Sequence, residues 1–157
     1  MAYADFDFYE NVYFGDELTA TTAPKWLERA SDAIDNITFH RLEQGMPVLE
    51  AHVTRVKKAV CAVAEVLYRV DLQRLAASAK KDEQGNIGAA VVSKTSGKES
   101  ISYVQSTESS VYAKAAADRS MLDALVYAEA ERYLADIPDV TGVNLLYMGV
   151  SRCATRR

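Results

Sequence analysis

The sequence has few of the residues on which most catalytic and metal sites depend. Its 157 residues include two histidines, His40 and His52, which lie twelve positions apart. They fit no spacing, such as His-Glu-x-x-His, that would place two metal ligands on one helix face. The two cysteines, Cys61 and Cys153, are too few for a disulfide framework. The sequence therefore favours a reduced intracellular protein with no metal site, no cofactor and no enzymatic activity.

The chain also lacks the long apolar runs and the excess of positive charge that mark two other classes of protein. No segment approaches the ~18 consecutive apolar residues of a membrane helix, and the N-terminus has no signal-peptide pattern. The net charge of -4 argues against a general DNA-binding surface, which needs an excess of Lys and Arg. One local exception stays open. Arg152, Arg156 and Arg157 form a basic tail that either meets an acidic partner or is a solvated terminus.

Aromatic side chains are abundant at the N-terminus. Phe6, Tyr9 and Tyr13 are spaced by three and four residues, which favours a helix over residues 4–14 that ends at Gly15. An aromatic strand is the alternative. The acidic residues between the rings suit the wet face of an amphipathic helix better than an acid-base or cation site. Because each ring hides about 150–250 Å² when buried, we expect this end to dock on the chain's own core or on a neighbour.

Hydrophobic periodicity predicts three further helices. A Thr-Thr-Ala-Pro start signal precedes an amphipathic helix over residues 24–38. Pro47 opens the longest helix, residues 48–79, whose valine stripe marks it as a central strut. Use of that stripe by a coiled-coil partner is the alternative. A broader apolar face predicts a last helix over residues 116–135, which Pro138 ends.

Between the last two helices the composition turns to Ser, Thr and Gly. Ala90–Lys94 and Ser100–Val104 resemble two strands joined by a five-residue turn. We expect them to form a β-hairpin arm, residues 88–106, that leans on a helix or on another subunit. The C-terminal residues 139–157 suit an extended segment lying in a groove. The expected fold is mainly α: one domain over residues 1–157, a small helical bundle around one long central helix, with the hairpin arm and the extended C-terminal segment.

The order of these segments resembles the head-tail connector, or adaptor, proteins of long-tailed bacteriophages and prophages. Tyr3–Gly15 is similar to the aromatic first helix of that family, Leu27–Phe39 to its second helix and Val56–Glu65 to its central helix. Ser93–Val104 is similar to its hairpin region, and Leu145–Val150 to its closing motif. The resemblance extends along most of the chain.

The resemblance implies a structural virion protein, made in the bacterial host cytoplasm, that forms a ring in the neck of the particle. The ring, commonly a dodecamer, would lie between the capsid portal and the next neck or tail-completion protein. Double-stranded DNA would pass through its lumen without sequence-specific binding, and a net acidic charge suits such a conduit because it repels phosphates. The alternative is a helical phage assembly chaperone or a host-directed interaction protein that is not retained in the virion.

The resemblance also implies two sets of contact residues. The C-terminal segment would dock on the portal protein, and the hairpin arm would lie at a boundary between subunits or partners. The portal-docking candidates are Leu145, Leu146, Tyr147, Met148, Val150 and Arg152. The subunit-contact candidates are Val91, Val92, Ile101 and Tyr103.

Overall fold

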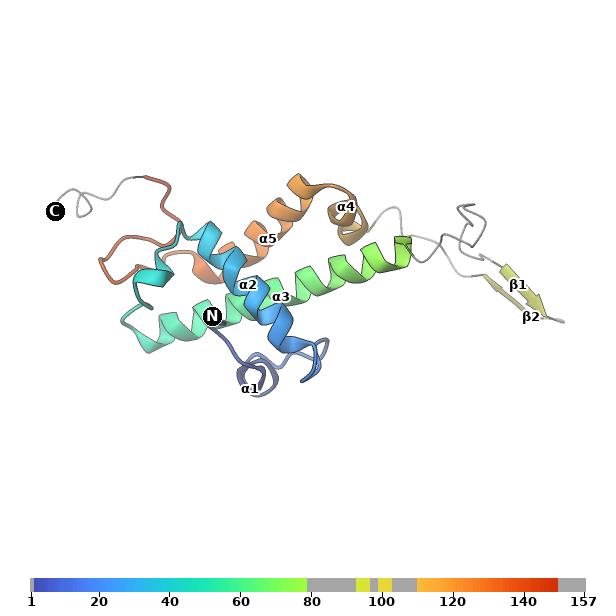
Figure 1. Ribbon diagram of the computed structural model, residues 1–157, viewed down its shortest axis with the longest axis horizontal. Coiled ribbons are helices and arrows are strands. Elements are labelled where there is room, and N and C mark those ends of the chain that lie inside the picture. The colour runs from blue at the N-terminus through green and yellow to red at the C-terminus, as the bar shows by residue number, and fades with distance from the viewer. Residues whose placement is uncertain (1, 79–92, 97–98, 103–109, 150–157) are drawn as a thin grey trace. The chain divides into compact units, whose positions relative to one another are not determined.

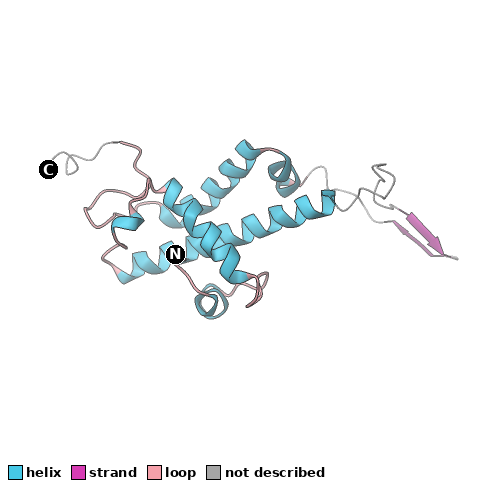
Figure 2. Ribbon diagram, viewed as in Figure 1, coloured by secondary structure: helices cyan, strands magenta, loops and turns pink. Residues whose placement is uncertain are grey.

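Helices make up most of the structure, a computed structural model that describes residues 2–78, 93–96, 99–102 and 110–149 (Figures 1 and 2). The chain divides into two compact units, one formed by Met1–Tyr68 and Ala124–Arg157, the other by Arg69–Asp123. The predicted fold class, mainly α, is confirmed for the described residues. Their helices are α1 (Phe6–Phe8), α2 (Ala23–Ile37), α3 (Glu50–Ser78), α4 (Val111–Ala117) and α5 (Arg119–Leu134), with a π-helix at Tyr9–Tyr13 and a 3-10 helix at Leu42–Gln44.

The long helix α3 supplies the core of the first unit. Val56, Val60 and Val63 of the predicted stripe are fully buried. Burial extends around the helix, since Cys61 and Val66 are buried as well, which is typical of a helix surrounded by the rest of its unit. In Figure 1, α2 crosses α3, and the ring of Trp26 packs edge-on against that of Tyr68 with centroids 5.9 Å apart. The sequence therefore predicted both helices and the core face of α3.

The aromatic N-terminus is helical, as the spacing predicted, and not a strand. It forms α1, whose Asp5 carboxylate accepts a hydrogen bond from the Phe8 amide, and then the π-helix. Tyr9 is fully buried. An added Cβ at Gly15 would lie 2.1 Å from Cζ of Tyr9, so only glycine lets the chain cross this ring.

The last predicted helix begins earlier than expected and is broken. Residues 116–135 were predicted as one helix, but the chain forms α4, leaves helical geometry at Asp118 and then forms α5. The Asp118 carboxylate accepts hydrogen bonds from the amide and the hydroxyl of Ser120, at 2.8 and 2.9 Å. This local capping competes with a continuous helix. In the described residues, no helix has the length and apolarity needed to cross a membrane.

The second unit contains two short strands, β1 (Ser93–Ser96) and β2 (Glu99–Ser102), which pair antiparallel. The predicted strands, Ala90–Lys94 and Ser100–Val104, overlap β1 and β2 at residues 93–94 and 100–102, but the predicted five-residue turn was wrong, because the pairing brings Ser96 opposite Glu99. The other positions of the predicted strands, 90–92 and 103–104, lie outside the described residues. Most of the predicted arm at 88–106 lies outside the described residues, so the structure does not support an arm.

Candidate functional site

The C-terminal loop, residues 137–149, folds back on itself at one end of the first unit. The Leu145 amide donates to the Ile137 carbonyl at 2.8 Å, and Pro138 pairs with Asn144 in an isolated bridge. Gly142 turns the chain with a φ of +84°, a conformation that favours glycine. The prediction of an extended segment over residues 139–157 is therefore wrong for the part that the structure describes.

One carboxylate organises the tip of this loop. Oδ1 of Asp139 accepts hydrogen bonds from the amide and hydroxyl of Thr141, both at 2.7 Å, and from the Val143 amide at 3.0 Å. Burial of the Asp139 carboxyl would raise its pKa, but these hydrogen bonds and the nearby charge of Arg41 outweigh burial and hold the pKa below its usual value. The loop is thus built around an ionised aspartate.

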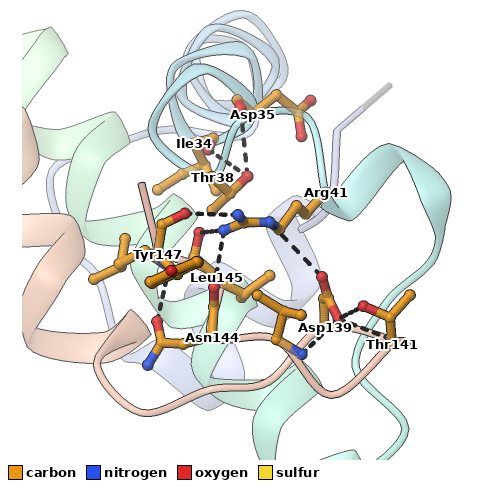
Figure 3. Close-up of polar contacts among 11 residues, drawn as sticks. Ile34, Asp35, Thr38, Arg41, Asp139, Thr141, Asn144, Leu145 and Tyr147 are labelled. Carbon is orange, nitrogen blue, oxygen red and sulfur yellow. Dashed lines mark hydrogen bonds and ion pairs between the residues drawn. The ribbon is translucent and has the colours of Figure 1, made fainter. Parts of the chain in front are cut away.

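Arg41 holds the loop against the end of α2 (Figure 3). Its Nη1 donates to the carbonyls of Asn144 and Leu145 at 2.8 and 2.9 Å, and its Nη2 donates to the Tyr147 carbonyl at 2.6 Å. Its Nε lies 3.8 Å from Oδ2 of Asp139, and the Arg41 side chain is only 13% exposed. Hydrogen bonds from a charged donor are stronger than neutral ones. A single side chain therefore satisfies three backbone acceptors of the loop.

A reversal of the chain after α2 brings Arg41 to this position. Thr38 is buried and donates its hydroxyl to the Ile34 carbonyl at 2.9 Å, which closes the helix end. Phe39 and His40 follow with φ values of +55° and +57°. Two consecutive non-glycine residues in the left-handed region are uncommon and cost free energy. The Arg41 guanidinium lies over the Phe39 ring, 5.6 Å from its centroid, so part of that cost is offset by this contact.

Backbone amides and carbonyls of the C-terminal loop form hydrogen bonds within the loop and to Arg41. Besides the three carbonyls bound to Arg41, the Tyr147 amide donates to the Asn144 carbonyl at 3.0 Å, and the Leu146 amide donates to Oδ1 of Asn144 at 2.8 Å. Addition of a strand to a neighbouring sheet requires a free row of such groups. In this conformation the loop can meet a partner through its side chains and not through a strand edge.

The predicted portal-docking residues separate into three groups. Leu145 is fully buried and belongs to the core of the first unit, so its side chain is unavailable to a partner, and Leu146 is half-buried. Tyr147 and Met148 are 51% and 78% exposed. The remaining candidates lie outside the described residues: Val150 and Arg152.

Of the predicted subunit-contact residues, the structure places one. Ile101 lies in β2, where it pairs with Lys94 of β1. The others fall outside the described residues: Val91, Val92 and Tyr103.

Sequence reasoning missed Arg41 and a group of exposed apolar residues near the loop. Phe39 is 47% exposed, and Val48 and Leu49, which precede α3, are 85% and 59% exposed. Val140, at the loop tip, is 43% exposed. Val48 and Leu49 were assigned to a helix start, and no spacing rule indicates that their side chains face solvent. Arg41 carried no sequence signal, because its partners are backbone carbonyls about a hundred positions away.

The described residues contain no group of three or more His, Cys, Asp and Glu side chains placed to hold a metal ion. Burial, together with the nearby Glu65 carboxylate, raises the pKa of Cys61 to about 12. This thiol therefore stays protonated and unreactive at neutral pH. The exposed side chains of the C-terminal loop, Tyr147 and Met148, are therefore better suited to binding a partner than to catalysis.

Comparison of the chain with known protein families, with curated proteins and with solved structures finds no match.

Proposed function

We propose that this protein is a structural virion component, a head-tail connector that forms a ring between the capsid portal and the next neck or tail protein. The ring, commonly a dodecamer in proteins of this kind, would complete the head and let double-stranded DNA pass through its lumen. The protein would catalyse no reaction. The proposal combines the resemblance of the sequence with the geometry of the C-terminal loop.

One observation carries the proposal: the loop is held firmly and yet exposes large side chains. Arg41 and Asp139 fix its backbone, while Tyr147 and Met148 are 51% and 78% exposed. An aromatic ring and a flexible thioether are typical anchors of protein interfaces. Because the loop is ordered before it meets a partner, little conformational entropy would be lost on binding. These features suit a docking element that inserts side chains into the portal protein.

Roles for the other candidate residues follow from their positions. Leu145 would support the docking element from the core and would not touch the portal. Val150 and Arg152 stay candidates for portal docking. Val91, Val92, Ile101 and Tyr103 stay candidates for contacts between subunits, through a hairpin arm that remains part of the proposal.

The proposed lumen requires a surface that does not hold DNA. The N-terminal segment carries exposed carboxylates on Asp7, Glu10 and Asp16, and a lining of that sign would repel phosphates during passage. We propose this segment as a candidate for the inner wall of the ring. Changing Asp7 and Glu10 to Lys would then slow DNA ejection and make it more sensitive to salt, measured by fluorescence of released DNA.

The alternative function is a helical assembly chaperone or a host-directed protein that does not remain in the particle. An exposed apolar docking loop would serve that role equally well. Mass spectrometry of purified virions separates the two, because only a connector is present in the finished particle in a fixed ratio to the portal protein.

Electron microscopy of the protein with capsids that expose their portal would test the proposal directly. We expect rings on the portal vertex for the unchanged chain, and loss of these rings when Tyr147→Ser is combined with Met148→Ser. A truncation is a poorer test, since it would remove Leu145 from the core.

A matched control for this experiment is Phe14→Asn. Phe14 is 80% exposed and has a φ of +61°, which Asn tolerates. This variant should still form rings. Portal vertices that stay bare with the unchanged chain, or rings that persist without Tyr147 and Met148, would contradict the proposal.

A further inference from the structure

Three exposed aliphatic side chains gather where the chain enters α3. We call Val48, Leu49 and Val140 the apolar cap; they are 85%, 59% and 43% exposed. The loop tip reaches this entry, because a Cβ added at Gly45 would lie 3.0 Å from Cγ1 of Val140. Burying each such side chain contributes about 1.5–3 kcal/mol. Exposed apolar side chains grouped in this way are a candidate surface for a partner.

Carboxylates surround the cap. Glu43, Glu50 and Asp136 are exposed. Glu43 stands two residues before Gly45, and Glu50 directly follows Leu49. Asp136 follows Ala135, whose carbonyl accepts a hydrogen bond at 3.0 Å from Arg55, five residues beyond Glu50 in α3.

The cations beside the cap are engaged with groups other than Glu50 and Asp136. Arg41 binds the loop carbonyls and Asp139, and Nδ1 of His40 lies 2.9 Å from Oε1 of Glu43. Arg55 holds the Ala135 carbonyl. The surface is therefore apolar at its centre and acidic at its rim, and it fits a short basic segment with small apolar residues.

This chain contains such a segment directly after the C-terminal loop. Residues 150–157 read Val-Ser-Arg-Cys-Ala-Thr-Arg-Arg, with three arginines, no acidic residue and small apolar side chains between them. Opposite charges across an interface favour encounter and fix its orientation. We infer that the apolar cap of one copy binds residues 150–157 of a second copy, which moves Val150 and Arg152 from the portal contact to a contact between copies and leaves Tyr147 and Met148 at the portal.

The contact is heterologous, because one copy supplies the cap and the other supplies the tail. Contacts of this type continue from copy to copy and close into a ring when the rotation allows it. The inference deepens the proposed function, since it rests on a ring and names one of its subunit contacts. A segment this short gives weak pairwise binding, and ring closure would strengthen it through many simultaneous contacts.

Two complementary variants test the inference. The tail-minus variant ends at Gly149 and keeps the cap; the cap-minus variant carries Val48→Ser and Leu49→Ser and keeps the tail. Both substitutions are at exposed positions, and serine before a helix caps it well, so folding should be retained, which circular dichroism would verify. Sedimentation velocity over a concentration series measures association of each variant alone and of their mixture.

We expect the full chain to associate as its concentration rises, each variant to stay monomeric, and the mixture to form one-to-one dimers and nothing larger. A full chain that stays monomeric, variants that associate alone as well as the full chain, or a mixture that stays monomeric would each overturn the inference. The last result is also what binding of the tail to its own cap would give.

A charge exchange sharpens the test. Changing Arg152, Arg156 and Arg157 to Glu should weaken association about tenfold or more, and mixing that variant with Glu43→Lys, Glu50→Lys should restore it. Asp7→Lys, Glu10→Lys reverses two exposed carboxylates of the N-terminal segment and should leave association unchanged. Failure of the charge exchange to restore association would overturn the inference.

The assay contains no portal, so its outcome is separate from that of the proposed function. If the variants fail to associate on mixing, the chain can still attach to the portal vertex in the microscopy experiment. Bare portal vertices leave the head-to-tail contact between copies standing.

Discussion

The two ends of the described chain both dock on the first unit, but they are held by different forces. The N-terminal segment buries aromatic rings: Tyr9 is fully buried, and its hydroxyl donates to Oε1 of Glu65 at 2.8 Å. The C-terminal loop buries Leu145 and is otherwise fastened by the hydrogen bonds of Arg41. The stabilisation from burying the aromatic rings grows with the apolar area removed from water. The stabilisation from the Arg41 hydrogen bonds depends instead on the distances and angles that this one side chain can reach.

The contacts of the N-terminal segment are also more widely distributed. Tyr3 donates its hydroxyl to Oδ1 of Asp35 at 2.6 Å, and its amide donates to Oγ of Ser31 at 3.0 Å, so α2 holds this segment as well as α3. The C-terminal loop has one principal holder. Removing a buried side chain should therefore reduce stability most in the N-terminal segment. Changing the hydrogen-bonding geometry of the side chain that holds the backbone should matter most in the C-terminal loop.

The largest expected effect is that of Tyr9→Ala. Removing this ring leaves a cavity and takes one hydrogen bond from the Glu65 carboxylate, so we expect a loss of about 3–5 kcal/mol in the free energy of unfolding. Urea denaturation measures it. Phe14→Asn, at an exposed aromatic position of the same segment, should change stability by less than about 0.5 kcal/mol. Equal losses in the two variants would mean that aromatic burial does not hold this end.

A smaller loss is expected for Leu145→Ala, which removes the apolar anchor of the C-terminal loop. Full burial of the side chain predicts a loss of about 2–4 kcal/mol. Met148→Ala, three residues further on and 78% exposed, should be nearly neutral. If Leu145→Ala were neutral by urea denaturation, the loop would not contribute to the core, and the comparison between the two ends would fail.

The next effect is local. Arg41→Lys keeps the positive charge but cannot reach three carbonyls at once, so we expect the loop to lose about 1–3 kcal/mol of local stability. Hydrogen exchange should show faster exchange of the Leu145 and Tyr147 amides. Arg55→Lys, where one carbonyl is bound, is the matched control and should change these amides less. Unchanged exchange in Arg41→Lys would remove Arg41 as the principal holder.

The smallest expected effect is a pH dependence of stability, which should differ between the N-terminal segment and the C-terminal loop. Burial, together with the Glu65 hydrogen bond, raises the pKa of Tyr9 to about 12, although amide hydrogen bonds oppose the shift. The stabilisation that Tyr9 contributes is therefore complete below its usual pKa of about 10 and is lost as pH rises through the folded-state value. Ultraviolet absorbance of tyrosinate follows this titration. Tyr9→Phe should abolish the alkaline step assigned to this residue.

The C-terminal loop should show the opposite dependence. The pKa of Asp139 is lowered, so its contribution is complete above the usual value of about 3.9 and is lost as pH falls through the lowered one. Carboxyl NMR titration measures this pKa. Asp139→Asn should remove the acid sensitivity of the Thr141 and Val143 amides. A titration of Asp139 at or above the usual value would contradict the proposed role of its hydrogen bonds.

Much of the helical framework could be predicted, because periodic burial leaves a periodic sequence. The stripe of α3, with Val56 and Val60, and the aromatic spacing of the first segment indicated both elements. The break at Asp118 could have been found from its Asp-x-Ser capping pattern. The short turn between β1 and β2 could not, since the Ser and Thr residues of these strands give no alternation to fix the register.

The candidate site was predicted only in part, because the C-terminal loop is shaped by contacts with residues that are distant in the sequence. Tyr147 and Met148 were named from the sequence and are exposed, but Leu145 was named with them and is buried. One apolar run thus divides between core and surface. The loop is too short for a periodic signal, so only its fold-back on Ile137 shows which side chain points inward.

The sequence by itself determined the helical character of the chain, the position of its central helix and the helical form of its aromatic N-terminus, because these depend on patterns between residues close in sequence. The tertiary structure alone decided the closed C-terminal loop, the role of Arg41 and the exposure of Val48 and Leu49. Those features depend on hydrogen bonds to backbone carbonyls and on burial by distant segments, and neither force leaves a mark in the local order of residues.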